Sequence, residues 1–285
     1  MEKLESKTSS LKCLNALYLK LLAMALMLSD HIWYVFFQEQ EALHWMTYIG
    51  RLAFPIFAFQ IVEGFAYTHN FKKYVGRVFL FALISEIPFN LAFYGSLSYP
   101  GHQNVMFTFC IALLLLEVIE KARKKGRTVF VLTAAICIVF GYFAGYITQV
   151  DYFGEGILLV MLLYFFRSMR FGWVGQLASM LFINLGLFGF YNISSIQWFS
   201  VVLQAFHDGQ TQWTQLGGYI FPLPFCGPDV TWALTEQALA ALALIPIWMY
   251  NRKQGPHNRA LQYTCYAFYP GHLLILGLLA KFLAG

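Results

Sequence analysis

The chain has 285 residues, of which 59% are hydrophobic, 19% aromatic and 12% charged, and its formal net charge is +5. A soluble globular domain carries about 25% charged residues, so the composition argues against a soluble enzyme and for an integral membrane protein. Lysines and arginines collect in short segments between apolar runs, with no basic stripe interleaved with aromatic residues, so no nucleic-acid partner is expected. The five cysteines lack Cys-x-x-Cys spacing, and neither a metal site nor a disulfide framework is expected.

Apolar runs of about 20 residues recur along the chain, and each is long enough to cross a hydrocarbon core. Lipid offers the backbone no hydrogen bonds, so these runs are expected to be helical, and they lack the alternation of barrel strands. The sequence therefore predicts an all-α polytopic transmembrane helix bundle, with about nine spanning helices in a single domain over 1–285. We place them near 14–37, 48–67, 74–94, 105–122, 128–148, 154–168, 171–191, 231–250 and 262–283.

The segments between these helices alternate in charge. Basic residues follow the second, fourth, sixth and eighth helices, whereas the intervening loops carry acidic residues and almost no lysine or arginine. The positive-inside rule then predicts a multi-pass protein of the cell (inner) membrane with a cytoplasmic N-terminus and the C-terminus outside. The first helix is expected to be an uncleaved segment. Residues 194–230 are rich in Gly, Pro and aromatic residues, and we expect a re-entrant or interfacial segment on the outer face.

Several polar side chains lie where lipid is expected. An ionisable group inside a spanning helix is costly unless it is partnered or faces water, so each is a candidate site residue. They are Asp30, His31, Arg51, Glu63, Glu86, Asn90, Asn104, Glu236 and His272.

Depth along the predicted helices groups six of these residues near the outer surface: Asp30, His31, Arg51, Glu86, Asn90 and Asn104. An acid, a base, a cation and amides from four consecutive helices are therefore expected to meet in one pocket. Because neighbouring side chains on a helix point about 100° apart, Asp30 or Glu86 is expected to pair with Arg51. That pairing leaves His31 facing substrate, as a general base or as a covalent carrier.

The remaining candidates lie deeper. His272 is expected near mid-membrane, roughly 10 Å from His31 along the membrane normal, a gap that a break at Pro270 and Gly271 would close. Glu63 lies in the inner half, where pairing with cytoplasmic lysines is the structural alternative. For the outer residues the alternatives are interfacial placement of Asp30 and His31, and an Arg51 side chain that extends to the headgroups. Glu236 is expected to be a helix N-terminal charge, and a Gly141–Gly145 pair predicts a close helix contact.

Six sequence blocks, in order, resemble the TraX family of conjugal-pilin acetylases and relatives. This family lies within a transmembrane acyltransferase superfamily that includes the heparan-α-glucosaminide acetyltransferase. The blocks are LKLLAMALMLSDHI (19–32), GRLAFPIFAFQIVEGFAYT (50–68), RVFLFALISEIPFNL (77–91), NVMFTF (104–109), DYFGEGILL (151–159), and YNRKQG with YAFYPGHLLIL (250–255, 266–276). Residues 194–230 have no counterpart in this resemblance.

The resemblance implies transfer of an acetyl group from cytosolic acetyl-CoA to an acceptor reached from the other side of the membrane. The acceptor would be a protein N-terminal amine, as in pilin, or a glycan hydroxyl. Within the blocks, His31, Asp30 and His272 are the catalytic candidates. The groups expected to orient substrate and donor are Arg51, Glu63, Glu86, Asn90, Asn104 and Asp151.

The expected partners are the bilayer, acetyl-CoA as donor substrate and the acceptor, with no metal. Lys72, Lys73 and Arg77 are candidates for attracting the CoA phosphates, although membrane topology alone accounts for them. Two other functions remain open. In a proton-coupled transporter or flippase, buried acids and histidines would relay protons, and a third possibility is a membrane scaffold for pilus or envelope assembly.

Overall fold

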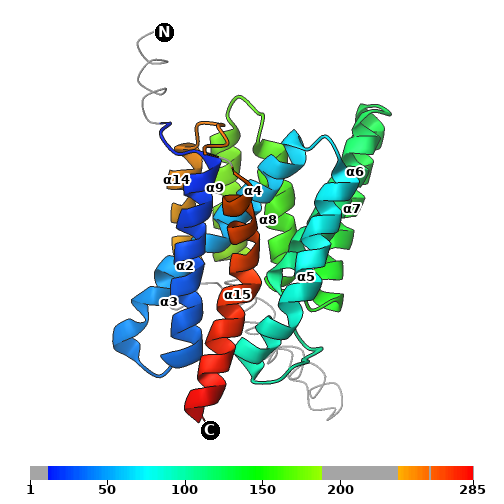
Figure 1. Ribbon diagram of the computed structural model, residues 1–285. Helices are drawn as coiled ribbons and strands as arrows, with labels where there is room; N and C mark the ends of the chain where they lie inside the picture. The colour runs from blue at the N-terminus through cyan, green and yellow to red at the C-terminus, as the bar shows by residue number, and fades with distance from the viewer. Residues whose placement is uncertain (1–11, 188–236, 257, 285) are drawn as a thin grey trace, which may run out of the picture.

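The computed structural model describes residues 12–187, 237–256 and 258–284, and over these ranges it is a bundle of helices (Figure 1). The longer helices are α2 (Ala16–Phe36), α4 (Ala53–Tyr67), α5 (Phe71–Tyr94), α6 (Val105–Arg123), α7 (Arg127–Ile147), α8 (Phe153–Phe166), α9 (Gly172–Leu181) and α15 (Arg259–Ala284). Shorter elements are η1 (Glu41–Leu43), α3 (Trp45–Gly50), the π-helical η2 (Phe182–Leu187), η3 (Gln237–Ala243) and α14 (Leu244–Trp248). The prediction of an all-α bundle is confirmed.

Within the described ranges, five helices are long and apolar enough to cross a membrane: Ala16–Phe36, Glu41–Tyr67, Phe71–Tyr94, Arg127–Ile147 and Ala260–Leu283. Other expected spans are shorter. Helix α8 has 14 residues, or about 21 Å of helix, and the expected helix near 231–250 is represented by η3 and the five-residue α14. Glu236 and the expected re-entrant stretch 194–230 lie outside the described residues.

The second expected span is interrupted at Arg51 and Leu52, between α3 and α4. Proline has no N–H to donate to the carbonyl four residues earlier, and its ring crowds that carbonyl. Pro55 stands four residues after Arg51, so a regular helix is disfavoured at that point. The interruption matters because it turns Arg51 into a junction residue beside α2.

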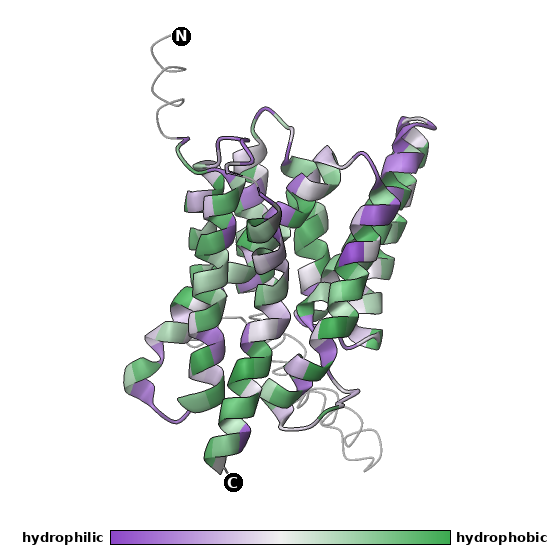
Figure 2. Cartoon of the chain, viewed as in Figure 1, coloured by the Kyte–Doolittle hydropathy of each residue, from purple (hydrophilic) through white to green (hydrophobic). Residues whose placement is uncertain are grey.

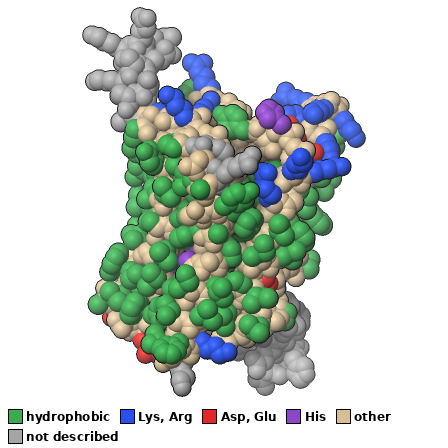
Figure 3. Space-filling model, viewed as in Figure 1, with side chains coloured by type: hydrophobic (Ala, Val, Ile, Leu, Met, Phe, Trp, Pro, Cys, Tyr) green, Lys and Arg blue, Asp and Glu red, His purple; other side chains and the backbone are tan. Residues whose placement is uncertain are grey.

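Helix α15 packs along α5 and α2, whereas α4 and α8 lie in the interior of the bundle and α7 packs on α6 and α8. Gly145 confirms the expected close contact, since a Cβ atom there would lie 2.4 Å from the backbone carbonyl carbon of Phe153. Hydrophobic side chains cover the flank of the bundle in Figure 3, and hydrophilic residues concentrate toward its ends in Figure 2. This distribution suits a bundle surrounded by lipid.

The start of α2 and the end of α15 lie at opposite ends of the bundle (Figure 1). Most lysine and arginine side chains visible in Figure 3 gather at the end where α2 begins. We call this the basic end and the other the distal end. A cytoplasmic location for the basic end stays a prediction from the positive-inside rule.

Candidate functional site

Two cavities enter the bundle from different ends and meet inside it. The first has a volume of about 560 Å³ and reaches the basic end, with Lys20 and Arg252 in its lining. The second has a volume of about 350 Å³ and includes Asp30, His31 and Arg51. Five residues line both cavities: Met27, Phe57, Val105, Phe109 and Tyr269. A layer of mostly apolar side chains therefore separates a space reached from the basic end from one that extends toward the distal end.

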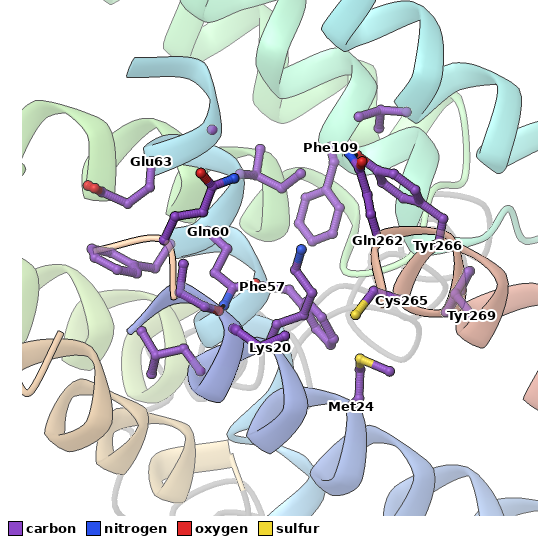
Figure 4. Close-up of a pocket in the computed structure, with 18 of the residues that line it drawn as sticks. Lys20, Met24, Phe57, Gln60, Glu63, Phe109, Gln262, Cys265, Tyr266 and Tyr269 are labelled. Atoms are coloured by element: carbon purple, nitrogen blue, oxygen red, sulfur yellow. Dashed lines mark hydrogen bonds between the residues drawn. The ribbon is translucent and has the colours of Figure 1, made fainter. Parts of the chain in front are cut away.

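The first cavity combines apolar walls with a cationic entrance. Figure 4 shows Lys20, Gln60 and Gln262 among the side chains around this space, together with Phe57 and Phe109. Arg77 and Arg252 are exposed and also line it. Among the described residues, the structure gives Lys20 no ion pair. An uncompensated cation on an otherwise apolar helix is costly unless it faces water or an anion, so this entrance suits an anionic ligand.

His31 and His272 form the central pair of the site. The Nδ1 atom of His31 lies 2.8 Å from Nε2 of His272, and Nδ1 of His272 lies 2.7 Å from the carbonyl oxygen of Phe268. His31 lines the second cavity, whereas His272 is buried behind it, 7% exposed. The expected gap of roughly 10 Å between the two histidines is wrong, because α15 runs beside α2 and brings His272 to the depth of His31.

The contacts of this pair determine where its protons lie if each ring carries one. A carbonyl oxygen only accepts hydrogen bonds, so Nδ1 of His272 must hold the proton directed at Phe268. The Nε2 atom of His272 is then an acceptor, and His31 donates to it from Nδ1. The free lone pair is left on Nε2 of His31. His272 thus fixes His31 in the tautomer that can accept a proton or attack a carbonyl carbon.

Asp30 is held by the short helix α3. The hydroxyl of buried Thr47 donates to Oδ1 of Asp30 over 2.5 Å, and Arg51 lies within electrostatic range of the same carboxylate. A Cβ atom on Gly50 would lie 2.3 Å from the Cβ of Asp30, so glycine is needed for this close approach. The expected pairing of Arg51 with an acid therefore involves Asp30, and both residues line the second cavity.

Glu86, Asn90 and Asn104 form a separate network. Asn104 donates from Nδ2 to Glu86 Oε2 (2.5 Å) and to the carbonyl of Ala82 (2.9 Å), while Asn90 donates to Glu86 Oε1 (3.3 Å). Asn104 also caps α6 by accepting from the backbone N–H of Met106. Neither cavity lining includes these three residues. The expectation of one shared pocket thus holds for Asp30, His31 and Arg51, but this network instead fixes the start of α6 against α5.

Glu63 pairs with an arginine rather than with cytoplasmic lysines. Nε of Arg167 donates to Glu63 Oε1 over 2.5 Å, and Nη2 lies 3.3 Å from Oε2. Glu63 is 8% exposed and lines the first cavity near its entrance. The pair joins α4 to the end of α8 and neutralises the only acid among the described residues that line the first cavity, so the net charge of that described lining is positive. Of the expected phosphate-binding residues, Arg77 lines this cavity, whereas Lys72 and Lys73 do not.

Asp151 lies in the lining of the second cavity together with a residue that sequence reasoning missed, His102. The Nε2 atom of His102 is 3.5 Å from Asp151 Oδ1. Tyr152, next in the chain, also lines this cavity, and burial, reinforced by Asp151, raises the pKa of its hydroxyl, which keeps it a hydrogen-bond donor. The sequence does not indicate His102 as a site residue, because it lies in a loop. Only inside a spanning helix is an ionisable side chain costly enough to indicate a site.

The described ranges contain no group of three or more His, Cys, Asp or Glu side chains arranged to hold a metal ion. The second cavity instead offers an imidazole with an open nitrogen, a guanidinium and two carboxylates around one space. Such a set of groups can exchange protons and stabilise a developing negative charge.

Comparison with known proteins finds relatives in two bacterial species. It is 31% identical over 112 residues to the probable fimbrial assembly protein FimC, serogroup H1, of Dichelobacter nodosus, covering 36% of this chain and 46% of that protein. It is 32% identical over 114 residues to protein TraX of Escherichia coli, covering 39% of this chain and 42% of that protein. The chain thus matches less than half the length of these curated relatives, and no solved structure matches it. A family match, described as TraX protein, extends over residues 16–280, and the chain therefore belongs to the TraX protein family.

Proposed function

We propose that this protein is a membrane-embedded acetyltransferase that takes an acetyl group from acetyl-CoA in the first cavity and delivers it to an acceptor in the second. The observation that carries this proposal is the meeting of the two cavities at a shared wall, beside a histidine with an open nitrogen. A single cavity open at one end would suit a reaction in which donor and acceptor arrive from the same side of the membrane. Two cavities that meet allow donor and acceptor to approach from opposite sides of a membrane.

The chemistry of the first cavity suits the donor. Its volume is within the range of about 300–1,000 Å³ typical of ligand sites, and its apolar walls suit the pantetheine arm of CoA. Lys20, Arg77 and Arg252 would attract the phosphates at the entrance. The thioester would then lie near Tyr269 and the other shared-wall residues, with the acetyl group toward His31.

Transfer breaks the bond between the acetyl carbon and the CoA sulfur, and the sulfur leaves with the electron pair and becomes a thiol by taking up a proton. The attacking atom is either Nε2 of His31, in a covalent route, or the acceptor itself with His31 as the base. Arg51 lines the same cavity and would stabilise the negative charge that develops on the acetyl oxygen. His272 is then a positioning residue for His31.

The acceptor would enter the second cavity from the distal end. One curated relative is named as a probable fimbrial assembly protein, which fits an envelope acceptor such as a pilin N-terminal amine, with a glycan hydroxyl as the other class. The positive-inside rule supports the inner membrane with the basic end in the cytoplasm, where acetyl-CoA is made.

Membranes containing the protein, supplied with radiolabelled acetyl-CoA, test this function. Wild-type membranes are expected to label an envelope protein or glycan, and His31→Ala membranes are expected to lose that labelling. His69→Ala is the matched control, because His69 is exposed and lines neither cavity. Labelling that survives His31→Ala would remove the assigned mechanism. Absence of labelling with every acceptor would favour a proton-coupled transporter or flippase, in which the same two cavities form a transport path.

A further inference from the structure

A third polar cluster lies in the second cavity, apart from the histidine pair. The hydroxyl of Tyr94 is 2.7 Å from Nδ1 of His102, and Nε2 of His102 is 3.5 Å from Oδ1 of Asp151. All three residues line the cavity. The side chains of His102 and Asp151 are 26% and 29% exposed, which places the cluster at the mouth rather than in the interior.

The backbone holds this cluster together. The loop before α6 and the loop before α8 pair with each other: Gln103 donates to the carbonyl of Gln149, and Asp151 donates to the carbonyl of Gln103, each over 2.8 Å. Gln149, Tyr152 and Phe153 have φ values of 52°, 59° and 40°. Three left-handed non-glycine residues around one aspartate are unfavourable and persist only where the surrounding structure enforces them. This strained turn therefore presents Asp151 toward the neighbouring loop.

The cluster and the histidine pair share the cavity but not their contacts. A row of aromatic rings connects them: His31 to Phe93 at 5.1 Å, Phe93 to Phe89 at 4.9 Å, and Phe89 to His102 at 5.6 Å between centroids. His31 lies beside the helix that carries His272, whereas His102 stands at the entrance on the distal side. An acceptor that enters from this side meets His102 and Tyr94 before it reaches His31.

We propose that Tyr94, His102 and Asp151 remove the proton from the acceptor, so that the two histidine sites serve the two halves of the transfer. This inference rests on the proposed acetyltransferase function. In the covalent route, the acceptor nitrogen or oxygen forms a bond to the acetyl carbon, and the bond from that carbon to Nε2 of His31 breaks with its electron pair. The acceptor proton passes to the Tyr94 oxygen as the Tyr94 proton moves to Nδ1 of His102.

The geometry fits this proton path. With its proton on Nε2 facing Asp151, His102 accepts from the Tyr94 hydroxyl at Nδ1. The imidazolium formed after transfer faces the Asp151 carboxylate, which stabilises its charge. The Nε2 atom of His102 is buried, so the proton returns to water through its partly exposed neighbours, Tyr94 (36% exposed) or Asp151 (29%). Tyr94 is the group that touches the acceptor, and Asp151 is a positioning residue.

The test uses purified full-length protein in sealed proteoliposomes that enclose two acceptor probes, a peptide with a free amino terminus and glucosamine, with [14C]acetyl-CoA added outside. We expect His102→Ala to lower the transfer rate about a hundredfold, with no change in the KM for acetyl-CoA. Added imidazole is expected to restore part of the rate, which a merely structural defect would not allow. His44→Ala is the matched control, because His44 follows η1, toward the distal end of α2, and lines neither cavity.

Tyr94→Phe is a second and milder variant, since it keeps the ring stacked 4.0 Å from Tyr99 and removes only the hydroxyl. We expect it to lose at least tenfold in transfer rate with an unchanged KM for acetyl-CoA. Wild-type rates in both variants, or a loss in His102→Ala that imidazole leaves unchanged while Tyr94→Phe is fully active, would overturn the proposal. In those cases the wild type still transfers label, whereas a wild type that labels neither probe would remove the acetyltransferase function itself.

Discussion

The histidine pair and the Glu86 network are both polar clusters of the helix bundle, yet they differ in whether an open hydrogen-bonding residue lines a cavity. Both Glu86 carboxylate oxygens accept bonds from asparagines, and Asn104 also bonds to backbone groups. His31 donates from one nitrogen and keeps the other open toward a cavity. Intramembrane polarity alone therefore does not identify a site. An open donor or acceptor that faces a cavity does.

The largest difference between the two clusters is expected in the transfer rate when His272 is replaced. His272→Ala removes the acceptor for the Nδ1 proton of His31, which lets that ring rotate and change tautomer. We expect acetyl transfer to fall about a hundredfold to a thousandfold, while the thermal midpoint in detergent changes little. Initial rates with labelled acetyl-CoA measure the first quantity. A variant with wild-type rates would show that His31 acts without a partner.

The opposite pattern is expected at Glu86. Glu86→Ala leaves the buried amide groups of Asn90 and Asn104 without their acceptor, each at about 1–3 kcal/mol. We expect a lower thermal midpoint but near-normal transfer per folded molecule, because neither cavity includes Glu86. Glu86→Gln, which keeps an accepting oxygen, is the control. Loss of activity without loss of stability would place Glu86 in the reaction.

A smaller loss of transfer rate is expected at Gly50, which contacts Asp30 in the catalytic cluster. Gly50→Ala places a methyl group 2.3 Å from the Cβ of Asp30, so α3 or Asp30 must move and the cavity beside Arg51 changes shape. We expect about a tenfold loss of transfer, within the sensitivity of catalysis to shifts of about 1 Å. Gly76→Ala on α5 meets nothing within 4 Å and serves as the control. Equal activities of the two variants would contradict the role given to this contact.

The mildest test concerns the donor cavity, which contains Cys265. If acetyl-CoA fills this cavity, the ligand is expected to slow alkylation of Cys265 several-fold. Cys13 is exposed and outside both cavities, so its alkylation rate should stay unchanged. Mass spectrometry of the labelled peptides measures both rates in one sample. If acetyl-CoA slows the alkylation of neither thiol, the donor binds elsewhere.

The sequence predicts the helices well because apolar runs flanked by basic loops leave few alternatives in lipid. It also predicts correctly that Asp30, His31 and Arg51 are neighbours, because the helical rise per residue gives the depth of each residue along its helix. It fails where depth depends on packing: counting residues separated His272 from His31, whereas α15 runs beside α2 and joins them. It also fails at His102, because the pairing of two loops far apart in sequence brings that residue to Asp151.

The central claim is that an acetyl group passes from a cavity at the basic end to one that extends toward the distal end. Sealed proteoliposomes with acetyl-CoA outside and an amine-terminated peptide inside test it most directly. Protein molecules whose basic end faces outward are first distinguished from those whose basic end faces inward. Transfer between the two cavities predicts labelled internal peptide only from molecules whose basic end faces the acetyl-CoA, and none when donor and peptide are on the same side. Equal labelling with donor and peptide together on one side would contradict transfer between the two cavities.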